Sequence, residues 1–130
     1  MRKLVLILTL IVSMCAIAAS NKKVCKHRNC PQVTDTKTIS LKDGILEYSG
    51  TSHASVGSDY TVEFNASEFD GVNEVQWNNP KSMEMGLCGG DKATIKYTLK
   101  PLKKGKFIVT EYHTFRGDTT EIITHRIIVK

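Results

Sequence analysis

Residues 93–112 read ATIKYTLKPLKKGKFIVTEY, and this stretch decides the fold class. Apolar and polar side chains alternate with a period of two over 94–99, and the alternation returns over 107–112. This is the pattern of half-buried β-strands rather than of a helix. Pro101 and Gly105 bound the polar segment between the two halves, and both are turn residues. The stretch therefore predicts a β-hairpin.

The same alternation recurs along the rest of the chain. No segment repeats apolar residues at the helical spacing for three turns, so no helix is expected after residue 19. About seven short strands separated by turn residues predict an all-β fold, an immunoglobulin-like β-sandwich. Besides the hairpin, strands are expected at 60–65 and 121–129, with shorter ones at 38–41, 45–48, 53–56 and 73–77.

The N-terminus has the three parts of a secretory signal peptide. Arg2 and Lys3 precede an apolar run over 4–15, and small residues at 16–19 offer a cleavage site. The run is too short to span a bilayer. We therefore expect a signal peptide at 1–19, a polar leader at 20–37 and one domain at 38–130. The product would be secreted or enter the lumen of a lysosome or phagosome, without a membrane anchor.

Charge excludes one class of partner. Signal cleavage lowers the formal net charge from +5 to about +3, and basic and acidic residues are interleaved in the strands. The basic stretches at 22–28 and 100–106 carry few aromatic residues, whereas nucleic-acid binding favours a basic stripe with stacking side chains. We expect a monomer that binds neither nucleic acid nor a cofactor.

Three of the four cysteines remain after cleavage. Cys25 and Cys30 are five residues apart, and in an oxidising compartment they could form a disulfide or remain two thiols. A metal site is the rival interpretation, but no second ligand cluster completes it. Cys88 is then the odd cysteine.

The search for a catalytic group yields little. Cys88 and His113 would suit a thiolate–imidazolium pair if they met, yet no clear residue orients the histidine. The glycines around Cys88 lack the lysine and the helix of a phosphate loop. The chain is therefore not expected to be an enzyme.

Hairpin geometry places two loops together. If 93–99 pairs with 106–112 around Pro101, the segments outside the hairpin, 86–91 and 113–118, lie at its other end. One end of the sandwich then carries a glycine-rich loop beside a loop with the aromatic Phe115. Whether 68–72 joins them depends on whether 82–85 forms one more strand.

These loops resemble those of a known family. The chain from residue 57 to 130 resembles chagasin-like inhibitors of papain-family cysteine proteases, small immunoglobulin-like sandwiches that insert three loops from one end into the enzyme's cleft. Gly86, Leu87, Cys88, Gly89 and Gly90, followed by a strand, are similar to the family's central glycine-rich loop.

The other two loops depart from the family pattern. His113 and Thr114 stand where the family has Arg-Pro before an aromatic residue, here Phe115. In the first loop, assigned to 66–71, only Gly71 remains of the family's Asn-Pro-Thr-Thr-Gly run. The resemblance implies that the protein inhibits papain-like cysteine proteases by occluding the cleft without being cleaved.

Three further points stay open. A secreted immunoglobulin-like binding or adhesion module with another partner is the alternative function. Cys88, at the tip of the central loop, could form a mixed disulfide with the target's thiolate. Asn65 begins an Asn-Ala-Ser glycosylation sequon, and its assigned place beside the first loop suggests that a glycan would crowd the cleft.

Overall fold

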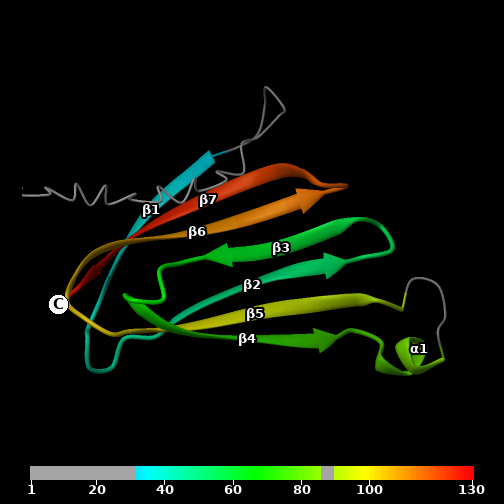
Figure 1. Ribbon diagram of the computed structural model, residues 1–130, viewed down its shortest axis with the longest axis horizontal. Coiled ribbons are helices and arrows are strands. Elements are labelled where there is room, and N and C mark those ends of the chain that lie inside the picture. Colours follow the sequence, from blue (N-terminus) through cyan, green and yellow to red (C-terminus); the bar gives the residue numbers. More distant parts are fainter. Residues whose placement is uncertain (1–31, 86–89) are drawn as a thin grey trace, which may run out of the picture.

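The protein is all-β, as the sequence predicts, and contains in addition one turn of helix (Figure 1). The computed structural model describes residues 32–85 and 90–130. The predicted signal peptide and most of the predicted leader lie outside this range. The elements in chain order are β1 (Gln32–Ile39), β2 (Leu46–His53), β3 (Ser58–Glu63), β4 (Phe69–Trp77), α1 (Pro80–Glu84), β5 (Lys92–Pro101), β6 (Gly105–Phe115) and β7 (Asp118–Val129).

The strands form two layers that face each other. Their hydrogen-bonded order is β1-β7-β6-β3-β2-β5-β4, but β2 and β3 share a single pair, His53 with Ser58. Rings from strands that are not neighbours in this order nevertheless touch. Tyr48 in β2 lies 4.8 Å from His125 in β7, measured between ring centroids. The layer β1-β7-β6-β3 therefore packs on β2-β5-β4, which confirms the expected sandwich.

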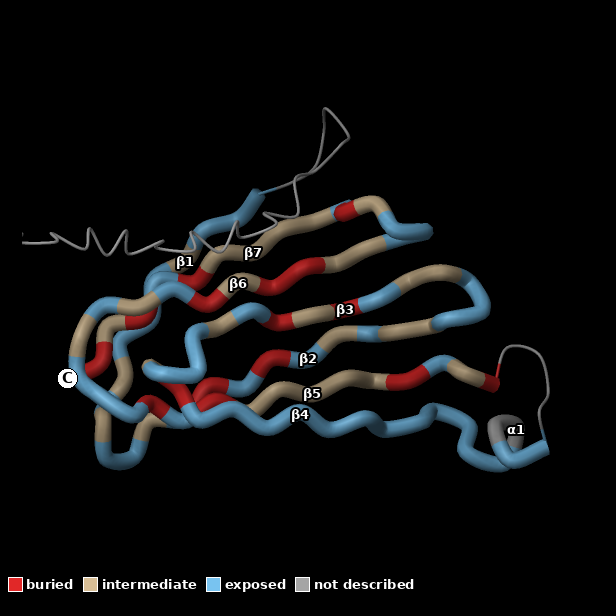
Figure 2. The backbone as a smooth tube through the Cα atoms, viewed as in Figure 1, coloured by how far each residue is buried: buried red, intermediate tan, exposed pale blue. Residues whose placement is uncertain are grey.

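The core lies between the two layers, where the alternation predicts it. Leu99 in β5 and Val109 in β6 are fully buried, and Phe69 packs edge-on against Phe107 with 5.6 Å between ring centroids. Burial along the strands is shown in Figure 2. The buried hydrophobic cluster contains Leu46, Tyr48, Tyr60, Val62, Phe69, Leu99, Val109, Ile127 and Val129.

Strand β1 begins earlier than the sequence suggests. It pairs in parallel with β7 from Gln32 to Ile39, so residues 32–37 belong to the sheet and not to a loose leader. Most of its side chains are exposed because β1 is an edge strand. A polar, exposed edge strand has the composition of a leader, which explains the wrong boundary at 37/38.

Two further local expectations are wrong. The predicted strand at 53–56 is the end of β2 followed by a turn, in which the N–H groups of Val56 and Gly57 donate to the carbonyl of His53. A five-residue helix, α1, was not expected. Pro80 suits the first helical position because its ring fixes a helical φ and its missing N–H is not needed there. One turn is too short for a periodicity to appear.

Three connections meet at one end of the sandwich (Figure 1). They are the β2–β3 turn at 54–57, the described parts of the β4–β5 connection, 78–85 and 90–91, and the β6–β7 turn at 116–117. We call this end the three-turn end. The β3–β4 connection at 64–68 and the β5–β6 connection at 102–104 lie at the other end. Within residues 32–85 and 90–130, no helix has the length and apolar composition that crossing a bilayer requires.

Candidate functional site

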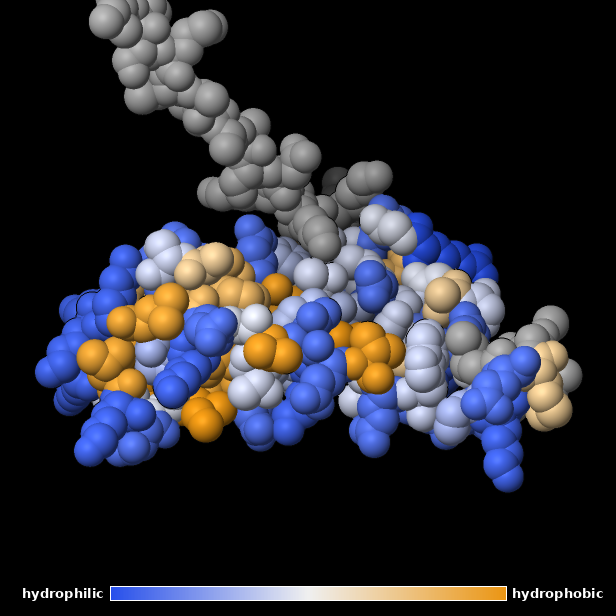
Figure 3. All heavy atoms as spheres, turned by 60° about the horizontal axis from the view of Figure 1, so that its bottom comes forward, coloured by the Kyte–Doolittle hydropathy of each residue, from blue (hydrophilic) through white to orange (hydrophobic). Residues whose placement is uncertain are grey.

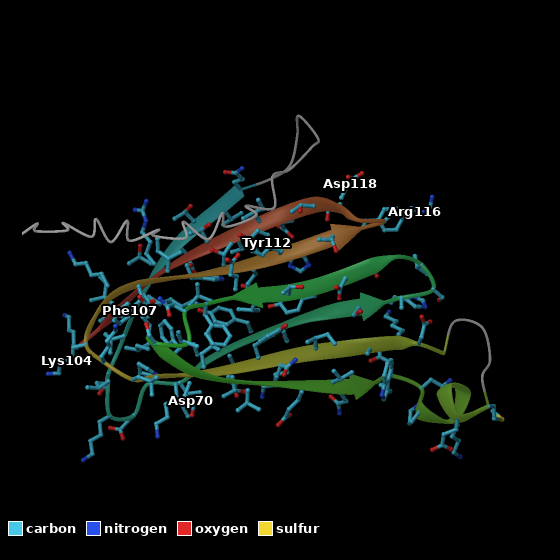
Figure 4. All side chains as sticks on the ribbon, in the orientation of Figure 1. Asp70, Lys104, Phe107, Tyr112, Arg116 and Asp118 are labelled. Atoms are coloured by element: carbon cyan, nitrogen blue, oxygen red, sulfur yellow. The ribbon has the colours of Figure 1, made fainter. Side chains whose placement is uncertain are left out.

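The β6–β7 turn is shorter than the loop predicted at 113–118. Phe115 pairs with Asp118, so only Arg116 and Gly117 lie between the strands. Their φ angles are 50° and 83°. Positive φ at both central residues is the mark of a type I′ turn, whose twist matches that of the flanking strands. Figure 4 shows Arg116 at the three-turn end and Lys104 at the opposite end. The predicted loop is therefore a rigid two-residue tip.

Of the residues predicted in this loop, Phe115 is the one presented at the tip. Its side chain is 41% exposed, and the guanidinium carbon of Arg116 lies 5.1 Å from its ring centroid. His113 and Thr114 lie within β6 and are half-buried. The ring of His113 packs 5.0 Å from that of Tyr60, measured between centroids. His113 and Thr114 therefore support the tip from below.

The β2–β3 turn lies directly beside this tip, and sequence reasoning missed it. The N–H of Arg116 donates to the carbonyl of Gly57 over 2.7 Å. Gly57 has φ 86°, a conformation that glycine adopts without steric cost. Val56 is 46% exposed on the same turn. The signal that could have revealed it is the run of small and turn residues from Ala54 to Ser58.

Gly71 is not brought to the three-turn end. It lies in β4 opposite Leu99, near the β3–β4 connection. A Cβ atom on Gly71 would lie 2.2 Å from the ring of Phe64, so packing in the sandwich requires glycine here. The prediction left open whether 68–72 joins the other loops. The helix at 80–84, in place of a further strand, leaves this segment at the opposite end.

Asn65 lies at the opposite end as well. It is exposed and its side-chain oxygen accepts a hydrogen bond of 2.9 Å from the N–H of Ser67, which closes a local turn. The structure therefore removes the suggestion that a glycan on Asn65 would crowd the three-turn end.

Several predicted site residues lie outside the described residues. These are Gly86, Leu87, Cys88 and Gly89, together with Cys25 and Cys30. Gly90 is described and is buried immediately before Asp91. On the other side, Met85 follows α1 and is 66% exposed. The described flanks thus place the ends of the glycine-rich loop at the three-turn end.

A hydrogen-bonded group ties this loop to the β2–β3 turn. The carboxylate of Asp91 accepts from the N–H of Ser55 over 2.5 Å and from its hydroxyl over 2.7 Å. Nε2 of His53 lies 3.2 Å from the same carboxylate. The hydrogen bond from the Ser55 hydroxyl is the main cause that lowers the pKa of Asp91. The carboxylate is therefore charged at mildly acid pH.

A second polar group lies in the core. Oε1 of Glu111 is 2.5 Å from Nε2 of His125, and the hydroxyl of Tyr60 donates to the same carboxylate. Nδ1 of His125 contacts Asp35 of β1. Glu111, His125 and Tyr60 are 8%, 5% and 2% exposed. No external molecule reaches such buried groups, so this network joins β1, β7, β6 and β3 rather than forming a reactive site.

The described residues offer no metal centre. Among residues 32–85 and 90–130, no group of three or more histidine, cysteine, aspartate or glutamate side chains is arranged to hold an ion. What the three-turn end can offer is a rigid surface with exposed apolar side chains. Such a surface suits binding to another protein.

Comparison with known proteins bears on this surface. No protein-family model matches the sequence, and no curated protein matches it. Solved structures do match. The cysteine protease inhibitor EhICP2 from Entamoeba histolytica aligns with a TM-score of 0.57 and 16% identity, over 76% of this chain and 94% of that chain. PbICP-C, in a structure of its complex with falcipain-2, aligns with a TM-score of 0.51 and 15% identity, over 77% and 90%.

The chain has the fold of these two proteins. The immunoglobulin-like, chagasin-like fold expected from the sequence is therefore confirmed. The first of these structures is that of a cysteine protease inhibitor.

Proposed function

We propose that this protein inhibits papain-like cysteine proteases by filling the active-site cleft with its three-turn end. The observation that carries the proposal is the meeting of the three connections at one end of a sandwich with this fold. One of the two structural neighbours was solved in complex with falcipain-2, which makes a protease a reasonable partner for this fold.

The surface is suited to insertion into a cleft. Phe115 and Val56 are apolar side chains exposed on neighbouring turns, and the bond from Arg116 to Gly57 fixes the distance between the turns. A surface that is already ordered loses little conformational entropy on binding. An aromatic anchor such as Phe115 is the type of residue that carries most of the energy of an interface.

The proposed mechanism is occlusion without cleavage. The residues at the tip form a two-residue turn between paired strands, so the backbone is held in the shape of the turn and not in an extended substrate-like form. The glycine-rich loop at 86–90 would lie nearest the target's catalytic thiol, with Phe115 against the wall of the cleft. In this proposal His53–Gly57 takes the place that the sequence interpretation gave to 66–71.

We place this activity in the secretory pathway, because residues 1–19 have the composition of a signal peptide. The protein would act as a monomer, outside the cell or in the lumen of a lysosome or phagosome, where it would meet its target.

Inhibition assays test the proposal. The protein, purified after signal cleavage, is titrated against several papain-like proteases with a fluorogenic substrate. We expect stoichiometric inhibition of at least one enzyme. Phe115→Ala should weaken inhibition about 30-fold, the effect of losing an anchor worth about 2 kcal/mol. Leu102→Ala is the matched control, because Leu102 is 54% exposed and lies at the opposite end.

One observation favours a second candidate, a binding module with a different partner. Edge strand β4 is exposed from Asp70 to Trp77, with Val72 58% and Val75 49% exposed. Figure 3 shows apolar side chains interspersed with hydrophilic ones on the face where β4 lies. An edge strand can pair with an extended partner. Absence of inhibition across the whole set of proteases would leave this alternative ahead.

A further inference from the structure

Asp91, at the end of the β4–β5 connection, makes direct hydrogen bonds to the β2–β3 turn. Its two carboxylate oxygens accept separately from the N–H and the hydroxyl of Ser55, over 2.5 and 2.7 Å. Bonds in which an ionised carboxylate accepts are stronger than bonds between neutral groups. Two such bonds to one residue fix both the position and the orientation of the turn.

We call the two hydrogen bonds between Asp91 and Ser55 the clamp. The β2–β3 turn that the clamp holds lies between the other two connections of the three-turn end. On one side Ser55 is held by Asp91, and on the other the carbonyl of Gly57 accepts from Arg116. The β4–β5 connection, the β2–β3 turn and the β6–β7 turn are therefore joined in a row by hydrogen bonds. If the first link is lost, the turn at 54–57 loses its hydrogen bonds to the β4–β5 connection, while His53 stays paired with Lys92 of β5.

We propose that Asp91 is a positioning residue that holds the β2–β3 turn in its binding geometry through Ser55. This inference rests on the proposed function. Asp91 itself need not touch the partner. Asp91 orders the β2–β3 turn before binding. The free energy of binding is therefore not reduced by the conformational entropy that ordering the turn would cost.

The chemistry around Asp91 suits this role over a range of pH. The Ser55 hydroxyl, and then the Ser55 N–H, lower the pKa of Asp91, so the clamp persists as the pH falls below neutrality. Nε2 of His53 in β2 faces the same carboxylate at 3.2 Å. Mild acid therefore leaves the clamp intact.

The location of the clamp separates its effect on binding from its effect on folding. Ser55 is exposed, so its N–H can donate to water when Asp91 is replaced. A surface group that water can satisfy contributes little to folding stability. The loss should therefore appear in the affinity for the protease and in the mobility of the turn, with little change in the melting temperature.

The test compares Asp91→Ala and Asp91→Asn with Asp70→Asn. Asp70 is exposed on β4 and lies toward the end opposite the three turns (Figure 4). Its replacement changes the net charge as Asp91→Asn does but leaves the clamp intact. We expect Asp91→Ala to weaken inhibition about tenfold, the cost of ordering the freed turn on binding. Asp91→Asn should be intermediate, and Asp70→Asn unchanged. Wild-type affinity in Asp91→Ala would overturn the proposal.

A double-mutant cycle identifies the partner of Asp91. Ser55→Ala removes the hydroxyl that donates to the carboxylate. If both residues act through one contact, the double variant Ser55→Ala/Asp91→Ala should bind about as weakly as Asp91→Ala alone. Additive losses would mean that Asp91 acts on the protease by another route.

An NMR measurement on the free protein separates this proposal from the proposed function. In the wild type, the Ser55 amide resonance should move with pH as Asp91 titrates, with a midpoint below that of an ordinary aspartate. In Asp91→Asn that movement should vanish and amide exchange at 54–57 should accelerate. A protein that inhibits no protease but shows this titration refutes the proposed function alone. A protein that inhibits but lacks it refutes the clamp.

Discussion

The substitution Glu111→Ala tests whether the buried polar network holds the sandwich together. The carboxylate of Glu111 lies 2.5 Å from Nε2 of His125 and accepts from the hydroxyl of Tyr60. It thus joins β6 to β7 on one side and to β3 on the other. Removing it leaves two polar groups without their partner, on side chains that are 5% and 2% exposed.

The expected loss is large relative to the stability of a small domain. Each buried polar group left without its partner costs about 1–3 kcal/mol, and Glu111→Ala leaves two such groups, Nε2 of His125 and the hydroxyl of Tyr60. The free energy of unfolding of a domain of this size is about 5–15 kcal/mol. Glu111→Gln keeps the volume and an acceptor for Tyr60, so its cost should be nearer 1–2 kcal/mol, the value of a charged hydrogen bond replaced by a neutral one.

Urea unfolding followed by circular dichroism measures these differences. Glu121→Ala is the matched control, since Glu121 is the same residue type on β7, its side chain is 38% exposed and it lies 3.8 Å from His113. The free energy of unfolding of Glu121→Ala should be within about 0.5 kcal/mol of the wild-type value. A loss below about 1 kcal/mol in Glu111→Ala would refute the reasoning, because the buried groups would then have found other partners.

Three further predictions follow from the core and from the opposite end. Gly50→Ala should lower stability by about 1–3 kcal/mol, because a Cβ there would lie 2.2 Å from the buried ring of Tyr60; an unchanged melting temperature would contradict this packing. Burial raises the pKa of Tyr48 and Tyr60, so above pH about 10 the unfolded chain releases protons that the folded protein retains. Stability is therefore fully present below pH about 10 and falls above it, by at most about 1.4 kcal/mol per pH unit for each tyrosine; a constant urea midpoint from pH 9 to 11 would exclude this. Protein expressed through a secretory pathway and glycosylated on Asn65 should inhibit as well as Asn65→Gln, because the sequon lies away from the three turns, and weaker inhibition by the glycosylated form would place binding at the other end.

The local sequence predicted those strands in which core-facing apolar residues alternate with residues that do not face the core. The hairpin of β5 and β6 was predicted because Leu99 and Val109 face the core while alternate residues do not. Only the end of strand β1 was predicted, because its stability comes from parallel pairing with β7, about ninety residues away, as in the pair Thr34 and Thr124. Its own side chains are mostly exposed and polar. Pairing of that kind leaves no local pattern.

The sequence identified only part of the candidate site, because long-range contacts fix the rest. Phe115 was identified by its type and resemblance, and the structure exposes it at the tip. The turn at 54–57 was interpreted as a strand, because the bond that fixes it joins Ser55 to Asp91, 36 residues away. Gly71 was assigned to the first binding loop by resemblance, while hairpin geometry left its end of the sandwich open, because that placement depends on whether 82–85 forms a further strand. One helical turn after Pro80 carries too little pattern to decide this.

The most direct test of the account is to map the surface that a protease covers. Spectra of the ¹⁵N-labelled protein are recorded before and after addition of a papain-like protease that the protein inhibits. The account predicts that amide resonances at 54–57 and 115–117 shift or broaden, while those at 65–68 and 102–104 stay in place. Changes confined to β4 or to the end that carries Asn65, with 54–57 and 115–117 unaffected, would contradict it.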